Sequence, residues 1–459
     1  MKSMTNHNSL KIHLIAVGGA IMHNLAIALK RAGHQVTGSD DEIFDPAKSA
    51  LETEGLLPEH HGWNPESIHA ELDAIILGMH AREDNPELAK AQELGLKIYS
   101  FPEFIFEQSK NKQRVVIAGS HGKTSITAMV MHVLNFQQKE FDYLVGSKVK
   151  GFDLSVQLSD APVIIIEGDE YLNSTLDRVP KFLKYHHHIA LISGIAWDHF
   201  NVFPTYEGYV KLFHDLADQS PKAGSLIYNE KDPEVKKIGK TKRTDVNHIP
   251  YKTHPYSVEN GQTFLKTDNG KVAVNIIGEH NMENLAGAKA ICKQLGITDA
   301  QFYEAMATFE SANKRLTPLK TTPEAMVYQD FAHSPSKVMA TTKAVAEQFK
   351  DRNTQVLLEL HTFSSLNKDF LPQYAGALDS AKQPIILVNE QVLQHKGLPA
   401  ISEEEIKAAF KKEDIQYVRN AEELKATFSG LAKEGNLLIM TSGNLAGVPI
   451  MELADDWTK

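Results

Sequence analysis

The chain has 459 residues, a length that suggests about three domains. Its hydrophobic content of 42% and charged content of 23% are those of a soluble globular protein, and no apolar run reaches the roughly 18–20 residues that a membrane-crossing helix needs. The net charge of −10, without a long basic run, disfavours a nucleic-acid partner. The single cysteine, Cys292, excludes an intramolecular disulfide and fits a reducing compartment, so we expect a cytoplasmic protein.

Short β-branched apolar runs alternate with longer helical patterns along three stretches, which is typical of parallel α/β sheets. In the first stretch, the sequence predicts a helix at 21–32 and strands at 12–17, 34–38, 73–77 and 96–99. The polar segment 108–114 (QSKNKQR) then indicates a linker.

The second stretch opens with a predicted strand at 114–118, a glycine turn and a helix through about residue 134, followed by buried strands at 163–166 and 189–192. The third stretch contains predicted strands at 327–329, 356–360, 385–388 and 437–441. We therefore predict an α/β fold with three domains in series, at residues 1–110, 111–315 and 316–459.

A strand, a glycine-rich turn and a helix follow one another where the sequence reads V-V-I-A-G-S-H-G-K-T, residues 115–124. This order gathers backbone N–H groups and the positive end of a helix around phosphate oxygens. In such a loop Lys123 reaches the β and γ phosphates of ATP, and the hydroxyl of Thr124 ligates Mg²⁺. Gly119 lies only three residues before Gly122, a shorter spacing than in the common ATPase loop. The loop therefore predicts ATP and Mg²⁺ as ligands, with a spacing unlike that of generic ATPases.

This short loop resembles that of the Mur ligase family, which reads close to G-T-x-G-K-T. Further segments resemble the family in the correct order: E-G-D-E at 167–170, Asp198-His199, G-E-H-N-M-E-N at 278–284, Lys314-Arg315 and D-F-A-H at 330–333. The resemblance covers nearly the whole chain. It implies a Rossmann-like UDP-sugar-binding domain at 1–110, an ATP-binding P-loop domain at 111–315, and a Rossmann-like domain for the amine or peptide substrate at 316–459.

The resemblance also implies roles for single residues. The residues that would bind ATP are Gly119, Ser120, His121, Gly122, Lys123, Thr124, Asn281, Asn284, Arg315 and Asp330. Those that would ligate Mg²⁺ are Thr124, Glu167 and His199, and those that would carry catalysis are Lys123, Glu167, His199 and Arg315. Asn284 would contact adenine, Arg315 the phosphate groups, and Asp330 the ribose. A purely structural role is the alternative for His199.

Other histidines leave alternatives open. His214 stands where some family members carry a carbamylated lysine, so that modification is not predicted; His214 is either a metal neighbour or an ordinary helix residue. His333 either assists the ATP site or serves a turn. Consecutive residues of an extended chain point to alternating faces, which disfavours a shared metal site at His186-His187-His188.

The glycine turn at Gly18 and Gly19, with Asp40 about 20 residues later, is similar to the start of a dinucleotide-binding fold. An NAD-dependent dehydrogenase is therefore a rival interpretation, but G-x-G-x-x-G is incomplete here and the G-K-T loop has no place in such an enzyme. A non-catalytic nucleotide-binding regulator is another alternative. The family resemblance implies instead that Gly18, Gly19, Ser39 and Asp40 bind a UDP-sugar.

Two kinds of Mur ligase start from UDP-N-acetylmuramate and proceed through an acyl phosphate made with ATP. One adds L-alanine; the other, in peptidoglycan recycling, adds L-alanyl-γ-D-glutamyl-meso-diaminopimelate. Segments 36–40, 177–185, 213–214 and 442–447 resemble the second kind, whereas H-T-F at 361–363 with Lys368-Asp369 is closer to the first. Gln329 and Ser334 depart from both. We expect the tripeptide ligase, with the alanine ligase as the alternative, and no nucleic-acid, membrane or obligate protein partner.

Overall fold

The computed structural model describes residues 9–459 except residues 80, 175, 198–201, 242 and 432. The chain forms two compact units and passes between them several times. Unit 1 comprises Met1–Gly119, Val130–Ser193 and Val210–Pro250, and unit 2 comprises Ser120–Met129, Gly194–Tyr209 and Tyr251–Lys459. No helix within the described ranges is long and apolar enough to cross a membrane. The α/β fold class is confirmed, whereas the domain boundaries at 110 and 315 stay predictions.

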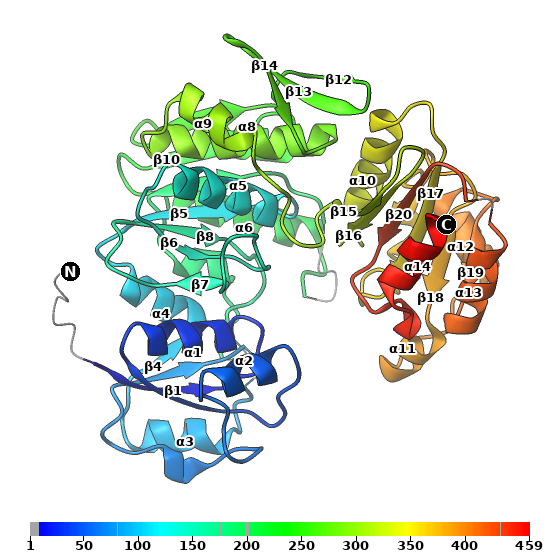
Figure 1. Cartoon of the computed structure of the whole chain (residues 1–459). Helices are drawn as coiled ribbons and strands as arrows, with labels where there is room; N and C mark the ends of the chain where they lie inside the picture. Colours follow the sequence, from blue (N-terminus) through cyan, green and yellow to red (C-terminus); the bar gives the residue numbers. More distant parts are fainter. Residues whose placement is uncertain (1–8, 80, 175, 198–201, 242, 432) are drawn as a thin grey trace. The chain divides into compact units, whose positions relative to one another are not determined.

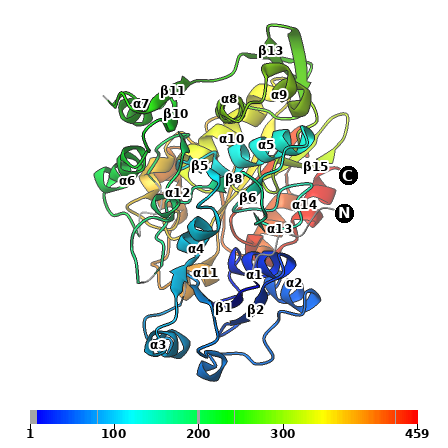
Figure 2. The same ribbon diagram turned by 90° about the vertical axis from the view of Figure 1, so that its left-hand side faces the viewer.

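The first sheet of unit 1 has four parallel strands in the order β2-β1-β3-β4. Its elements are β1 (Lys11–Ile15), α1 (Met22–Arg31), β2 (Gln35–Ser39), α2 (Ala47–Thr53), η1 (Pro65–Ser67), β3 (Ala74–Leu77), α3 (Pro86–Glu93), β4 (Ile98–Ser100) and α4 (Phe101–Gln108). Every strand predicted here is present, with ends shifted by one or two residues. Figure 2 shows α1 and α2 beside β1 and β2, so these helices cover part of the sheet.

The predicted linker at 108–114 is too long. Helix α4 continues to Gln108 and strand β5 begins at Gln113, so only four residues separate the two elements. The polar composition was misleading because Arg114 is buried within β5, where its guanidinium donates to the carbonyls of Ser109 (2.6 Å) and His186 (2.9 Å). The sequence alone does not distinguish a buried arginine that donates to carbonyl oxygens from an exposed one.

The second sheet of unit 1 has seven strands in the order β11-β10-β9-β5-β8-β6-β7. The elements of this region are β5 (Gln113–Ala118), α5 (Lys123–Phe136), β6 (Asp142–Leu144), β7 (Val156–Gln157), β8 (Val163–Glu167), η2 (Lys181–Lys184), β9 (Ile189–Ile192), α6 (Tyr206–Asp218), β10 (Ser225–Asn229), α7 (Pro233–Gly239) and β11 (Asn247–Tyr251). Strand β5 is central and pairs in parallel with β8 and β9. Its carboxyl end therefore opens at the middle of the sheet edge, the usual place for a ligand in α/β proteins.

Unit 2 contains a six-stranded sheet in the order β15-β16-β20-β17-β18-β19 and a three-stranded antiparallel sheet, β12-β13-β14 (Figure 1). The elements before the larger sheet are β12 (Tyr256–Glu259), β13 (Gln262–Thr267), β14 (Gly270–Val274), α8 (Glu279–Gln294) and α9 (Asp299–Met306). Those of the larger sheet are β15 (Thr317–Thr321), β16 (Met326–Asp330), α10 (Pro335–Gln348), β17 (Thr354–Leu360), η3 (Leu371–Tyr374), β18 (Ile385–Val388), α11 (Glu390–His395), α12 (Glu403–Phe410), β19 (Gln416–Val418), α13 (Ala421–Ser429), β20 (Asn436–Met440), η4 (Leu445–Gly447) and α14 (Ile450–Trp457).

The antiparallel strands β12 to β15 were not predicted from the sequence patterns, and neither were the parallel strands β6, β10 and β19. Strands β12, β13 and β14 form a meander in which many side chains are exposed, and β15 adds an antiparallel edge to the parallel strands of the larger sheet. Strands with one solvated face have polar residues at alternate positions. Such short, half-polar segments lack the continuous apolar runs that identified the buried parallel strands.

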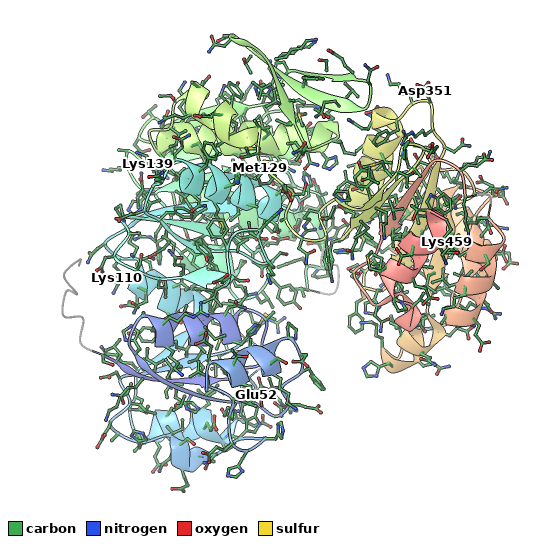
Figure 3. The ribbon with its side chains drawn as sticks, viewed as in Figure 1. Glu52, Lys110, Met129, Lys139, Asp351 and Lys459 are labelled. Atoms are coloured by element: carbon green, nitrogen blue, oxygen red, sulfur yellow. The ribbon has the colours of Figure 1, made fainter. Side chains whose placement is uncertain are left out.

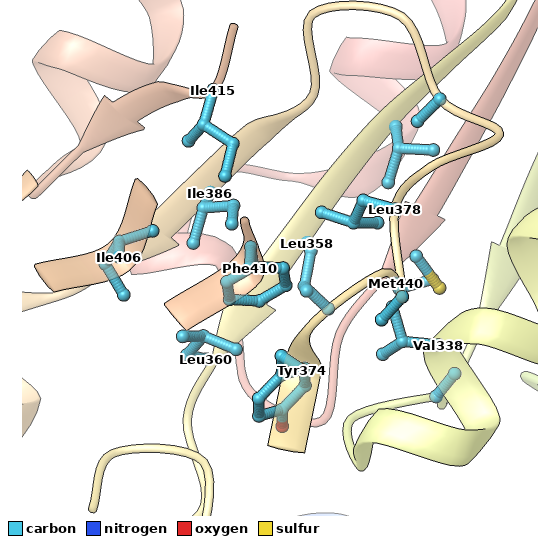
Figure 4. Packing of buried hydrophobic residues seen from close by; sticks show 14 of the residues in the cluster. Val338, Leu358, Leu360, Tyr374, Leu378, Ile386, Ile406, Phe410, Ile415 and Met440 are labelled. Carbon is cyan, nitrogen blue, oxygen red and sulfur yellow. The ribbon is translucent and has the colours of Figure 1, made fainter. Parts of the chain in front are cut away.

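The larger sheet of unit 2 has a hydrophobic core on each face. On one face, Phe410 of α12 stacks on Tyr374 with ring centroids 4.8 Å apart, next to Leu358 and Leu360 of β17 (Figure 4). All four side chains are buried. Their packing holds β17 in place and, with it, the residues that follow its carboxyl end.

Replacing Phe410 by alanine removes a buried aromatic ring, and we expect a loss of stability of about 3–5 kcal/mol. Thermal or denaturant unfolding of the variant measures this loss. Met451→Ala is the matched control in the same unit, because Met451 is 42% exposed and its removal should cost less than about 0.5 kcal/mol. Equal losses in the two variants would contradict the assignment of this core.

Candidate nucleotide-binding site

The phosphate loop connects β5 to α5, as predicted. Gly119 and Gly122 both have positive φ angles, +132° and +79°, a conformation that side chains of L-residues disfavour. Ser120 holds the loop in place: its hydroxyl donates to the carbonyl of Gly194 (3.1 Å) and accepts the N–H of Ala196 (2.6 Å). The serine predicted to bind ATP is thus buried and supports the loop from behind.

A close contact of the loop with helix α8 explains the glycine at position 122. A Cβ atom there would overlap the side-chain oxygen of Asn284. Asn284 is buried, and its Nδ2 donates to Oδ1 of Asn281 (3.3 Å); Nδ2 of Asn281 in turn donates to the carbonyl of Ile277 (2.9 Å). The predicted ATP-binding asparagines therefore form one hydrogen-bonded chain beside the phosphate loop. Contact of Asn284 with adenine stays a prediction.

Gly194 shows the same kind of contact on another segment, since a Cβ there would overlap the ring of His121. His280, at the start of α8, has its pKa lowered to about 4 because it is buried and His121 lies near it. The ring of His280 is therefore expected to be a neutral neighbour of the loop. A role for His280 was not predicted; its only signal in the sequence was its place inside the G-E-H-N segment.

Thr124 and Arg315, far apart in sequence, meet in unit 2. The hydroxyl of Thr124, at the start of α5, accepts a long hydrogen bond from Nη2 of Arg315 (3.4 Å). The guanidinium of Arg315 also lies over the ring of Phe331, 5.2 Å from its centroid. Helix α5 is anchored by buried residues such as Met129, labelled in Figure 3. A hydroxyl suited to Mg²⁺ and a guanidinium suited to phosphate are thus side by side at a helix N-terminus, an arrangement that fits a Mg-nucleotide.

Asp330, at the end of β16, is buried and uses both carboxylate oxygens on backbone N–H groups. Oδ2 accepts from Leu316 (2.6 Å) and Oδ1 from Ala332 (2.7 Å). Burial raises the pKa of Asp330 above its ordinary value despite the nearby positive charge of Arg315. Asp330 therefore holds the segment that carries Arg315, and its contact with ribose stays a prediction. His333 bonds through Nδ1 to the carbonyl of Phe331 (2.9 Å), in line with its turn alternative.

Glu167 is the last residue of β8 and lies opposite Ile117 of β5, beside the strand end from which the phosphate loop starts. Its Oε2 accepts the N–H of Gly146 (2.7 Å). A Cβ on Gly146 would lie only 3.2 Å from Oε1 of Glu167. The carboxylate is therefore positioned by backbone at the carboxyl edge of the sheet, where an acidic ligand for Mg²⁺ is expected. Asp198-His199, the other predicted metal-site segment, lies outside the described residues.

The predicted UDP-sugar residues form a separate group in the first sheet of unit 1. Oδ2 of Asp40 accepts the N–H of Gly18 (2.7 Å), and Gly19 accepts from Nδ1 of His23 (2.9 Å). Burial raises the pKa of Asp40 to about 6, and the neighbouring Asp41 adds to this shift. Asp40 therefore lies against the glycine turn, and the binding of a UDP-sugar by these residues stays a prediction.

Ser39 is predicted to bind a UDP-sugar, and this contact stays a prediction. It is buried, and its hydroxyl donates to Oε2 of Glu87. The same carboxylate lies 3.4 Å from Nε2 of His13 and accepts the N–H of Asn64 (2.6 Å) through its other oxygen. Glu87 was not identified from sequence, because its partners lie far from it along the chain.

The three consecutive histidines have three different surroundings. The ring of His186 packs against Phe106, Nε2 of His187 is bonded to the hydroxyl of Ser220 (2.9 Å), and Nδ1 of His188 accepts the N–H of Arg114 (3.1 Å). Burial lowers the pKa of His187 to about 3. These partners indicate structural roles. His214 lies half-buried on α6.

Comparisons with known proteins relate the chain to one family. Residues 11–113 match the model described as "Mur ligase family, catalytic domain", and residues 117–292 match "Mur ligase middle domain", together more than half of the chain. A Sulfurihydrogenibium protein named UDP-N-acetylmuramate–L-alanine ligase is 27% identical, with 98% of this chain and 97% of that protein covered.

Two further proteins extend the comparison. A Haemophilus influenzae protein, named UDP-N-acetylmuramate–L-alanyl-γ-D-glutamyl-meso-2,6-diaminoheptandioate ligase, is 26% identical, with 73% of this chain and 76% of that protein covered. The crystal structure of a UDP-N-acetylmuramate-alanine ligase from Thermotoga maritima has the same fold, with a TM-score of 0.70, 20% identity and 98% of each chain covered.

Gly122→Ala places a methyl group against Asn284 in a backbone conformation that alanine disfavours, so we expect the affinity for ATP to fall at least about tenfold. Equilibrium titration with ATP measures this. Gly151→Ala is the matched control: Gly151 also has a positive φ (+85°), but nothing lies within 4 Å of its Cβ position. Unchanged ATP affinity in the Gly122 variant would remove this turn from the nucleotide site.

Glu167→Gln keeps the acceptor for the Gly146 N–H but loses the negative charge. We expect the Mg²⁺ concentration needed for half-maximal activity to rise and turnover to fall more than about tenfold (~1.4 kcal/mol). A magnesium titration of ATP turnover checks this, with Glu234→Gln on the exposed face of α7 as control. An unchanged titration would make Glu167 a structural residue of the strand end.

Proposed function

Because the chain belongs to the Mur ligase family, we propose that it joins an amine-bearing acceptor to UDP-N-acetylmuramate with hydrolysis of ATP to ADP and phosphate, in the cytoplasm. Members of this family are ATP-dependent ligases that generally use Mg²⁺. Carboxylate and amine do not condense unaided in water. Transfer of the γ-phosphoryl group to the carboxylate gives an acyl phosphate, whose carbonyl an amine can attack.

The contact between Thr124 and Arg315 is the observation that carries this proposal. The 3.4 Å hydrogen bond from Nη2 of Arg315 to the hydroxyl of Thr124 joins the segment that follows α9 to the phosphate loop. It supports the proposal that the guanidinium binds phosphate oxygens. In phosphoryl transfer the protein mainly positions the groups and neutralises charge. We assign Lys123 and Arg315 to that neutralisation, and the buried Asn281–Asn284 pair to the support of the loop.

We assign the Mg²⁺ ligands to Thr124, Glu167 and His199. A hydroxyl and a carboxylate are the oxygen ligands that Mg²⁺ prefers, whereas an imidazole is an unusual one. When bound, Mg²⁺ neutralises phosphate oxygens and aligns them with the substrate carboxylate. Glu167 is already held by the Gly146 N–H, so the protein orients this carboxylate before the ion arrives.

We assign the UDP-sugar to the glycine turn at Gly18 and Gly19, with Asp40 beside it. The hydrogen bond from the Gly18 N–H to Asp40 supports a rigid corner at this turn. Ser39 supports this turn indirectly. Its hydroxyl donates to Glu87, whose other carboxylate oxygen accepts the N–H of Asn64. Gly62, two residues earlier, donates to the carbonyl of Asp40 (2.8 Å), so the same network supports both sides of Asp40.

For the acceptor we propose the tripeptide L-alanyl-γ-D-glutamyl-meso-diaminopimelate. The support is the segment 177–185, which resembles that of tripeptide ligases and is held by side-chain contacts: Asn173 donates to Asp177 (3.0 Å), and Lys184 pairs with Asp177 and, at 3.4 Å, with Glu103. The second candidate acceptor is L-alanine. It is favoured by the relatives named L-alanine ligases, which align over 82–98% of this chain.

Steady-state kinetics with each acceptor decides between the two. The tripeptide offers charged groups beyond its reacting amine, and such remote contacts lower the barrier. We expect kcat/KM to favour the tripeptide by at least about two orders of magnitude, roughly 3 kcal/mol. Equal or better use of L-alanine would overturn the tripeptide assignment and leave the ligase proposal in place. Absence of ATP turnover with UDP-N-acetylmuramate and either acceptor would overturn the ligase proposal itself.

A further inference from the structure

A buried carboxylate near the end of β17 has an oxygen without a hydrogen-bond donor. Glu359 is 0% exposed. Its Oε2 accepts from the hydroxyl of Thr441 and from the N–H of Leu445 (3.1 Å), whereas Oε1 is buried and unbonded. An unsatisfied buried carboxylate oxygen is costly unless it serves a purpose. The arrangement therefore points to a function for the side of Glu359 that carries Oε1.

That side faces a histidine. Nδ1 of His361 lies 3.7 Å from Oε1 of Glu359 and is likewise buried and unbonded, while the side chain as a whole is 30% exposed. The carboxylate thus approaches the imidazole at its buried nitrogen, on a side chain that is partly exposed. Gly443 closes over the pair: a Cβ there would lie 2.5 Å from Nδ1 of His361 and 2.8 Å from Oε1 of Glu359.

The pair stands at the carboxyl edge of the larger sheet in unit 2, where ligands of α/β proteins bind. Strand β20 lies between β16 and β17 in this sheet (Figure 1). Thr441, directly after β20, donates its N–H to the carbonyl of Asp330 (3.0 Å) and its hydroxyl to Glu359. The carboxylate of Asp330, at the same edge, accepts the N–H of Leu316, which follows Arg315 in the chain. The pair is therefore linked by hydrogen bonds to the segment that contacts the phosphate loop.

The carboxylate behind this histidine is charged. Burial raises the pKa of Glu359, but the nearby His361 and the hydrogen bonds from Thr441 and Leu445 outweigh burial, so the pKa lies below its ordinary value and the group stays ionised. An ionised carboxylate beside an imidazole orients the ring and can balance a positive charge on it. Two other ionisable groups at this edge are already engaged, Asp330 by two N–H groups and His333 by the carbonyl of Phe331.

We propose that His361 accepts the proton that the acceptor's amine releases when it attacks the acyl phosphate, and that Glu359 is the positioning residue behind it. This inference rests on the ligase function proposed above. The nitrogen lone pair forms the new N–C bond, the bond from the carbonyl carbon to the phosphate oxygen breaks, and phosphate leaves with that electron pair. The proton goes from the nitrogen to the imidazole, and its positive charge is balanced by the carboxylate of Glu359.

The test separates acyl-phosphate formation from amine attack. Hydroxylamine is unprotonated at neutral pH and converts an acyl phosphate to a hydroxamate; its nitrogen releases a proton to water, so no base from the protein is needed. With ATP, Mg²⁺ and UDP-N-acetylmuramate, we expect His361→Asn to form hydroxamate within about threefold of wild type but to ligate the peptide or amino acid at least about 100-fold more slowly. Glu359→Gln should show the same split with a smaller loss of ligation, because the ring remains but is less well held.

Two controls address a purely structural role. Thr441→Val removes the hydrogen bond to Oε2 and leaves Oε1 and His361 in place, so any loss should affect ligation and hydroxamate formation equally. Glu405→Gln, on the surface at the start of α12, should change neither. Should Glu359→Gln fail to fold, the partly exposed His361 still decides the matter. Parallel loss of both reactions in His361→Asn, or undiminished ligation, would overturn the inference, whereas wild-type protein that makes no hydroxamate would overturn the proposed ligase function.

Discussion

The ATP-binding half of the candidate site depends on one buried carboxylate, that of Asp330. Taking a charge out of water is costly, and here two backbone N–H groups, from Leu316 and Ala332, offset that cost. Because both bonds go to backbone, they determine where the chain runs on each side of β16. Leu316 follows Arg315 directly. The bond from the Leu316 N–H to Asp330 therefore positions the backbone of Arg315, whose guanidinium then reaches Thr124.

Close approach of side chains to the backbone is the second constraint, and it restricts three positions to glycine. Gly122 leaves room for Asn284, Gly194 for the ring of His121, and Gly443 for the pair of Glu359 and His361. In each case a methyl group would occupy the space of a polar side chain from a segment distant in sequence. Polar groups packed this tightly against backbone lose little entropy on binding a ligand, since they are already ordered.

Features encoded locally could be predicted from the sequence. The strands at Ile189–Ile192 and Ile385–Val388 were predicted to the residue, and the turn from β5 into α5 was identified from its glycines. What could not be predicted depends on partners distant along the chain: the hydroxyl of Ser39 bonds to Glu87, 48 residues later, and that of Thr441 to Glu359, 82 residues earlier. Neither pair leaves a periodic signal, because each is made only when the fold brings together two elements that are distant in sequence.

The reaction type is easier to infer than the identity of the acceptor. Both candidate acceptors present the α-amine of an L-alanyl residue, so the reacting nitrogen and the proton that it must lose are identical. A base such as His361 therefore serves either substrate and cannot distinguish them. Discrimination has to come from groups that contact the rest of a peptide, and those contacts act through binding energy far from the reacting atoms. Residues 177–185 belong to unit 1 and His361 to unit 2, so the assignments proposed above place acceptor choice and proton transfer in different parts of the chain.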